Sequence, residues 1–274
     1  MHKAQLGDNH PNTATSLNNL ATLYQSQDDI PQAIEFLSQG IAVEEYNLSQ
    51  NLNIGDEKQK RDYIATVSGT TDGIISLNLQ SAPNNPEATR LALKTILQRK
   101  GRILDVLTNS QQILRQQIND PESQTLLEQL IQKQTQLSNL TFQRPETIKS
   151  PEIHRQQLIN LQAETQQLED KLSRRSAEFR NLSQPITLEA IQKLIPTNAA
   201  LVEIVRYKPF NPKATKDSEK FGNPHYAVYI LFANGEIKAQ DLGEAQPIDE
   251  QVTAFRRNLA DSKTPIPQLK KSAR

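Results

Sequence analysis

Residues 196–243 read PTNAALVEIVRYKPFNPKATKDSEKFGNPHYAVYILFANGEIKAQDLG and carry the only strong β-strand pattern in the chain. The runs LVEIV at 201–205 and AVYILFA at 227–233 are rich in β-branched and aromatic residues, which favour strands. Asn234-Gly235 separates the second run from the alternating stretch EIKAQDL, which is the pattern of a β-hairpin. Because 227–233 is apolar on both faces, we expect a central strand of an α/β sheet covered on both sides.

Helices are expected on either side of this sheet. A short helix over 185–196 leads into the first strand. A second, amphipathic helix over 247–259 follows the last strand, and its apolar face is expected to pack on the sheet. The apolar positions of that helix are Ile248, Val252, Phe255 and Leu259.

Composition narrows the classes of function. The 274 residues allow two domains, and 31 basic residues balance 31 acidic ones, so charge gives no reason to expect nucleic acid or acidic lipid as a partner. The chain has no cysteine, which excludes disulfides, thiolate metal sites and a cysteine nucleophile within it. It also lacks an apolar run of about 18 residues and an apolar N-terminal leader. We therefore expect a soluble, cytoplasmic protein.

No catalytic or cofactor motif is present. The sequence holds no phosphate-binding glycine loop, no HExxH, no GxSxG and no calcium loop, so neither a cofactor nor a metal is expected. The carboxylate pairs Glu44-Glu45 and Glu169-Asp170 are interpreted as solvated charges on exposed helix faces.

Three of the four histidines are interpreted as follows. His10 has a structural role in a turn, and His154 is solvated at the start of a helix. His225 precedes a strand, and nothing in its surroundings marks it as a catalytic base.

Residues 6–45 predict two antiparallel helices. Small residues in the predicted seam allow the helices to approach closely, and larger ones fill the rest. The seam positions are Leu17, Leu20, Ala21 and Tyr24 on the first helix and Ala33, Leu37 and Gly40 on the second. This pattern resembles a tetratricopeptide repeat of the kinesin-light-chain type, with Asp28 in place of the usual turn glycine.

Only one full copy of the repeat is present, and one repeat cannot bury its own face. Either preceding repeats are missing or the following helices cap it, and a start inside an inter-repeat linker favours a cut array. The resemblance implies a protein or peptide partner in the concave groove, where Asn18, Thr22 and Gln25 are the predicted partner-binding residues. Asparagine amides suit an extended backbone because they donate and accept hydrogen bonds. The alternative is that all three are solvated helix-face residues.

The middle of the chain is predicted to be helical. Residues 56–80 form a looser helix pair broken at 68–73, and 86–109 form a long helix in which Gly101 marks either close packing or a tolerated glycine. Heptad spacing over 121–142 and 151–183 predicts an antiparallel helical hairpin, with an intermolecular coiled coil as the alternative. The seam of the second segment is Leu158, Leu161, Thr165, Leu168, Leu172, Arg175, Phe179 and Leu182.

The segments KGRILDVL, IP…ALVEIVRY, YAVYIL and DLGEAQPID…VTAFRRNL occur in an order that resembles the N-terminal part of a CHAT domain, over residues from about 90 to 274. That caspase-like domain follows tetratricopeptide repeats in bacteria, and the resemblance implies a bacterial, cyanobacterial TPR-CHAT protein. In that family the histidine and cysteine of the catalytic dyad come later than residue 274. The implied domains are a repeat at 1–50, a helical region at 51–185 and a truncated CHAT domain at 186–274.

The predicted fold is therefore mostly α, followed by a small, incomplete α/β caspase-like sheet. The favoured function is a non-catalytic interaction and regulatory part of a signalling protein, acting as a monomer. One alternative is part of a caspase-like cysteine peptidase whose dyad lies beyond residue 274. A second alternative is a structural coiled-coil scaffold.

Overall fold

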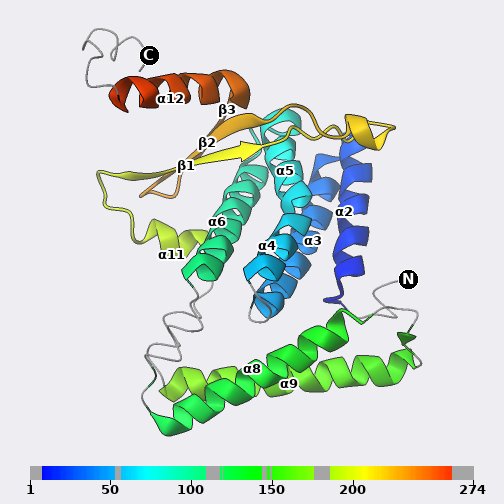
Figure 1. The fold of residues 1–274 in the computed structure, drawn as a ribbon. Helices are drawn as coiled ribbons and strands as arrows, with labels where there is room; N and C mark the ends of the chain where they lie inside the picture. The colour runs from blue at the N-terminus through cyan, green and yellow to red at the C-terminus, as the bar shows by residue number, and fades with distance from the viewer. Residues whose placement is uncertain are drawn as a thin grey trace. The chain divides into compact units, whose positions relative to one another are not determined.

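The computed structural model describes residues 8–52, 57–108, 118, 120–143, 147–148, 150–175 and 186–260 (Figure 1). As predicted, the fold is mostly helical with a small sheet toward the C-terminal end. It divides into two compact units. The first comprises Met1–Thr71 and Leu91–Ile191, and the second comprises Asp72–Arg90 and Gln192–Arg274. The division runs through helices α5 and α6, so each unit contains part of both.

The first unit begins with the predicted helical hairpin, α2 (Pro11–Ser26) and α3 (Ile30–Asn51). His10 caps α2, because its Nδ1 accepts a hydrogen bond from the Asn12 N–H at 3.0 Å, which confirms its structural role. The rings of Tyr24 and Phe36 stack across the seam with their centroids 5.3 Å apart. The small seam residues Ala21 and Ala33 are buried, so the two helices lie close together.

The turn between these helices contains a strained residue. Asp28 has φ 62°, the left-handed region that glycine adopts without cost and other residues rarely adopt. The next residue, Asp29, caps α3 by accepting a hydrogen bond from the Gln32 N–H at 3.3 Å. Asp28 thus stands where the repeat pattern has glycine, and it keeps the glycine conformation.

We predict that Asp28→Gly raises the free energy of unfolding by about 0.5–1 kcal/mol, because it removes the left-handed strain. The matched control is Asp29→Ala, which removes the cap of α3 and lowers that free energy by about 1 kcal/mol. Urea unfolding of both variants measures the two effects. A destabilised Asp28→Gly variant would show that the carboxylate contributes more than its backbone strain costs.

The next helices are α4 (Glu57–Thr66), α5 (Ser68–Ser76) and α6 (Pro86–Thr108), with a π-helical turn at Leu77–Ser81 after α5. The predicted break at 68–73 is wrong: that segment is the start of α5, and the interruption falls at Val67, which is buried. In α6, a Cβ at Gly101 would collide with the side chain of Ile186, so close packing explains this glycine.

Helices α8 (Pro121–Thr141) and α9 (Pro151–Arg175) pack against each other within the chain. Arg175 at the end of α9 pairs with Glu122 at the start of α8 at 2.8 Å, so the two helices are antiparallel. Their shared core contains Leu127, Leu130 and Leu172. The predicted seam residues Phe179 and Leu182 lie outside the described residues.

Two predictions about polar residues of this hairpin are wrong. His154 is buried rather than solvated, and its Nε2 lies 3.0 Å from the Leu140 carbonyl oxygen. Glu169 is half-buried, and Gln134 of α8 donates a hydrogen bond to its carboxylate at 3.3 Å, whereas Asp170 is exposed as predicted. Burial raises the pKa of Glu169 above its ordinary value. Both side chains face the partner helix, which their sequence positions alone do not reveal.

The second unit contains an antiparallel sheet of β1 (Ala200–Tyr207), β2 (His225–Phe232) and β3 (Ile237–Glu244), in the order β1-β2-β3. The short helix α11 (Leu188–Gln192) precedes it, and a 3₁₀ turn (Asp217–Glu219) lies in the β1–β2 connection. The predicted hairpin forms, with Gly235 at φ 88°. The Phe232 N–H bonds to the Glu236 carbonyl at 2.9 Å, so the loop has three residues rather than two.

One face of the sheet is fixed by a polar chain from the π-helical turn. Tyr229 is fully buried, and its hydroxyl donates a hydrogen bond to Asn78 Oδ1 at 3.0 Å. The Asn78 amide in turn donates to the Thr89 hydroxyl at 2.9 Å. Each of these three side chains has a hydrogen-bond partner, so the buried Asn78 amide can specify the position of β2.

The other face of the sheet is largely open, which corrects two predictions. β2 is the central strand, but its second face is only half-buried, and Val202 and Ile204 beside it on β1 are exposed. Helix α12 (Ala245–Ala260) reaches the sheet through its first turns, where the Tyr226 hydroxyl donates to Asp249 at 2.7 Å. Because only those turns meet the sheet, Val252 and Leu259 remain exposed.

A partly buried carboxylate gives the second unit a pH dependence. Burial raises the pKa of Asp72 to about 6 from 3.8, although the backbone N–H and the charge of Lys208 oppose the rise. Between about pH 4 and 6 the folded protein holds a proton that the unfolded chain releases. The stability from this proton is complete below pH 4 and is lost as the pH rises through 6.

We predict that Asp72→Asn raises the free energy of unfolding at pH 7 by about 1–2 kcal/mol, because the neutral amide avoids the cost of partly burying a charge. At pH 4 the gain should vanish. Urea denaturation at both pH values provides the measurement, with Asp170→Asn on an exposed helix face as the control. An equal effect at both pH values would contradict the titration of Asp72.

Candidate functional site

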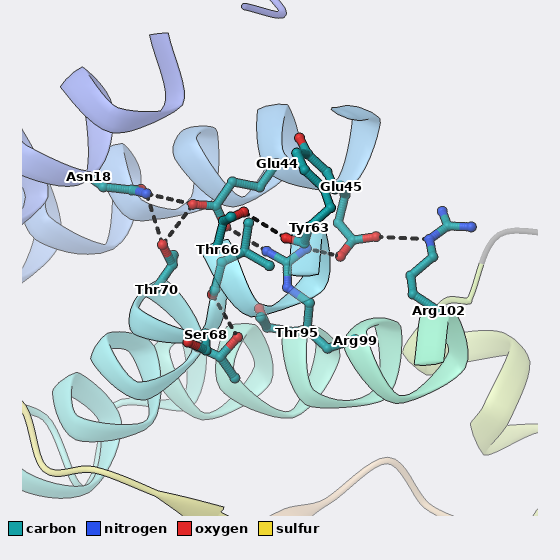
Figure 2. A network of polar contacts seen from close by, with 12 residues as sticks. Asn18, Glu44, Glu45, Tyr63, Thr66, Ser68, Thr70, Thr95, Arg99 and Arg102 are labelled. Atoms are coloured by element: carbon teal, nitrogen blue, oxygen red, sulfur yellow. Dashed lines mark hydrogen bonds and ion pairs between the residues drawn. The ribbon is translucent and has the colours of Figure 1, made fainter. Parts of the chain in front are cut away.

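One side of the α2–α3 hairpin is closed by a buried ionic network (Figure 2). Glu44 and Glu45 on α3 receive the guanidinium of Arg99 on α6, with Nη2–Oε2 and Nη1–Oε1 distances of 2.6 and 2.5 Å. Arg102, one turn further along α6, reaches the second carboxylate at 3.4 Å. Glu44, Glu45 and Arg99 are largely enclosed, whereas Arg102 is more accessible. The prediction that Glu44-Glu45 is a solvated pair is therefore wrong.

The same network extends to α2 and α5. The Asn18 amide donates hydrogen bonds to Glu44 Oε1 at 2.8 Å and to the Thr70 hydroxyl at 3.0 Å. The Thr70 hydroxyl donates to Glu44 Oε1 at 2.7 Å. Four helices, α2, α3, α5 and α6, therefore meet at one carboxylate.

The electrostatics make Glu44 the sensitive point of the network. Burial raises its pKa above the ordinary value, and the Arg99 guanidinium, with the hydrogen bonds from Thr70 and Asn18, opposes that rise. A buried carboxylate is tolerated only while such partners remain.

Gly40 explains how Asn18 fits between the helices. A Cβ at this position of α3 would collide with the Asn18 side-chain oxygen. Glycine is therefore needed there because α2 presses its amide against the α3 backbone. This is the close approach predicted for the seam, with a polar side chain filling the gap.

The three predicted partner-binding residues have different environments. Asn18 is held in the network, and Gln25 is buried. Thr22 is half-buried, and its hydroxyl donates to the Asn18 carbonyl at 3.0 Å. All three lie on α2, but the hydrogen bonds of Asn18 and the burial of Gln25 give these two residues a structural role. Their binding of a partner stays a prediction.

The opposite side of α2 is open. Leu20 is 39% exposed and Leu23 is 50% exposed, which is high for leucines of a helical hairpin. They lie two and five residues after Asn18, so at 100° per residue they point away from the network. Leu20 and Leu23 form what we call the α2 leucine surface. Sequence reasoning placed Leu20 in the seam and did not single out Leu23.

Comparison with known proteins agrees with the geometry of the first hairpin. Residues 1–44 match the family model of the tetratricopeptide repeat. The chain carries a tetratricopeptide repeat. This confirms the predicted repeat. No curated protein and no solved structure matches the chain.

Outside the repeat, the most conspicuous polar pair is His225 and Asp241 in the second unit. The His225 Nδ1 lies 3.1 and 3.2 Å from the two carboxylate oxygens, and the ring packs edge-on against Tyr207. Burial, followed by the charge of Asp241, raises the pKa of Tyr207 well above its usual range.

Among the described residues, no three histidine or acidic side chains gather as a metal site would require. No helix in the described residues is long and apolar enough to cross a membrane.

Arg99 and Thr70 are the functional positions of the network that sequence reasoning missed. Arg99 and Arg102 lie three residues apart, on one face of α6, and could have been matched with Glu44-Glu45 as a cross-helix ion pair. Thr70 gives no comparable signal, because its role depends on where α5 lies.

We predict that Arg99→Met lowers the free energy of unfolding by about 3–5 kcal/mol, since it leaves a buried carboxylate unpaired. Adding Glu44→Gln should recover part of this loss. Arg102→Met, which removes the more accessible guanidinium, is the control and should cost about 1 kcal/mol or less. Chemical denaturation of the three variants measures the effects, and a small loss of stability in Arg99→Met would show that the network contributes little.

Proposed function

We propose that this chain is a protein–protein interaction and regulatory part of a tetratricopeptide-repeat protein of the CHAT type, non-catalytic as it stands and acting in the cytoplasm. The observation that carries the proposal is the asymmetry of the repeat. One side is closed by the network around Glu44, whereas the other side presents the α2 leucine surface.

The α2 leucine surface fits a helix. Repeats of this kind stack through apolar helix faces, and each repeat needs a neighbour to bury its own face. Leucines at positions i and i+3 are the spacing that a second helix packs into. The partner is therefore an amphipathic helix, from a further repeat or from another protein.

Groove binding is the second element of the proposal. An extended peptide contacting Asn18, Thr22 and Gln25 would have to compete with the hydrogen bonds of Asn18 to Glu44 and Thr70. The contact of a peptide with α2 would then also loosen α5. The α2 leucine surface needs no such rearrangement, and it is the better supported of the two.

The CHAT-like character of the C-terminal part is supported by the order of its elements. A short helix, a strand, a hairpin and an amphipathic helix follow one another over residues 186–260. The absence of cysteine from all 274 residues supports a non-catalytic role, because a caspase-like peptidase needs a thiolate nucleophile.

We predict that a photo-crosslinking amino acid at Leu20 or Leu23 of the full chain captures a partner of discrete mass in cells of the organism that encodes it. These side chains are accessible, so the substitution should leave the fold intact. The matched control is Leu194, which is 82% exposed but lies outside the repeat.

The test has a second arm. Leu20→Ser with Leu23→Ser should abolish the capture from a crosslinker at the nearby exposed position Asn19, with no change in helical content by circular dichroism. Capture of the same proteins from Leu194, or capture that survives the double substitution, would refute the helix-binding surface.

A further inference from the structure

The two edges of the sheet differ in a way that points to a second interface. Edge strand β3 carries Lys238, which pairs with Glu236 of the preceding loop at 3.4 Å. It has Gly243 at φ 85° and pairs with β2 through a register shift between Tyr226 and Ala227. Charged residues and bulges are the devices by which proteins prevent an edge strand from pairing with another chain.

Edge strand β1 has two charged residues, Arg206 and the buried Glu203, but no register shift. Its eight residues, ALVEIVRY, pair with β2 in continuous register and contain neither proline nor glycine. On its open face Val202 is 53% exposed and Ile204 is 60% exposed. A long, regular edge strand with exposed apolar side chains is a template for a further strand.

The backbone groups that would pair can be deduced from the hairpin. The Phe232 N–H bonds to Glu236 of β3, and hydrogen-bonded pairs alternate along antiparallel strands, so Leu231, Tyr229 and Ala227 bond to β1. Their partners on β1 are Leu201, Glu203 and Val205. The N–H and C=O groups of Val202, Ile204 and Arg206 therefore point to the outer edge.

We propose that β1 is the docking site for β1 of a second copy of this chain, in an antiparallel pair centred on Ile204. This inference goes beyond the proposed function, because it does not involve the repeat. The result is a continuous six-stranded sheet, β3-β2-β1 followed by the partner's β1-β2-β3. Two-fold symmetric dimers, in which the same surface of both copies meets, are the commonest oligomers of soluble proteins.

The register follows from charge and length. An axis at Ile204 overlaps residues 201–207 of both copies and places Glu203 opposite the partner's Val205. An axis at Glu203 would set two enclosed carboxylates opposite each other, and an axis at Arg206 would do the same with two guanidinium groups. An axis at Val202 would overlap only residues 200–204. Ile204 therefore gives the longest pairing without like charges.

This pairing also covers part of the open face. Ile204 lies opposite Val228 on β2, so the interface aligns Val228 and Ile204 with the partner's Ile204 and Val228 in one apolar row. Cross-strand pairs of β-branched side chains contribute about 0.2–1 kcal/mol each. The dimer replaces exposed edge groups with hydrogen bonds and shields the exposed side of Ile204.

Single-cysteine variants test the register, because the chain has no cysteine of its own. In a pair centred on Ile204 the two Cα atoms at this position lie about 5.5 Å apart, which a disulfide spans. Val202→Cys would separate the two sulfur-bearing residues by roughly 13 Å, beyond the reach of a disulfide. We expect mild oxidation to convert Ile204→Cys largely to a covalent dimer and to leave Val202→Cys and Lys238→Cys monomeric.

A charge-bearing variant tests the interface without crosslinking. Ile204→Lys places a charge opposite its own copy at the two-fold axis and should raise the dimer dissociation constant about tenfold or more in sedimentation velocity. Ile204→Val is the matched control. Two results would overturn the proposal. One is a wild-type chain that sediments as a monomer at 100 μM, a concentration on the order of the dissociation constants of the weaker specific associations. The other is equal crosslinking of the three cysteine variants.

Discussion

The ion pair between Arg99 and the adjacent carboxylates Glu44 and Glu45 is the interaction on which the helical part of the protein depends. A single repeat has one apolar seam between its own helices and cannot bury the faces that a neighbour would cover. Here α5 and α6 supply part of that neighbour through a polar contact, and α4 adds an apolar one with Leu48 and Leu52. The arrangement places a costly buried charge where apolar packing would be simpler, so the contact is specific and also vulnerable to loss of either partner.

The second unit uses a comparable device on a smaller scale. Asn78, in the π-helical turn, connects the hydroxyls of Tyr229 and Thr89 and so fixes the central strand against the adjoining helices. In both units a buried amide or carboxylate determines which elements meet, while aliphatic side chains supply the burial. Apolar side chains remain exposed on α2 and on β1, among other places, and we propose that at both of these another chain adds an element of the same kind.

Much of the fold could be predicted because its signals are local. Helical spacing gave the hairpin of the repeat and the α8–α9 pair, and Asn234-Gly235 gave the β-hairpin. The errors concern tertiary contacts. His154, Glu44 and Glu169 look solvated in the sequence, since histidine and glutamate are usually exposed, but each faces a neighbouring helix. The covering of the sheet was overestimated because an apolar strand does not reveal whether a helix lies on its second face, as Val202 and Ile204 show. Asn18 was predicted from its place in the motif, whereas its contacts depend on where α5 and Gly40 lie.

The central claim is that the repeat is stable because the following helices close it. Native-state hydrogen exchange on the full chain tests this claim most directly, because it reports the opening free energy of each helix. The account predicts that buried amides of α2, α3 and the Arg99 turn of α6 exchange with one shared opening free energy. It also predicts that this value falls for all three helices together when Arg99 is replaced. If α2 and α3 kept their protection while α6 lost its own, the repeat would be stable by itself, and the account would be wrong.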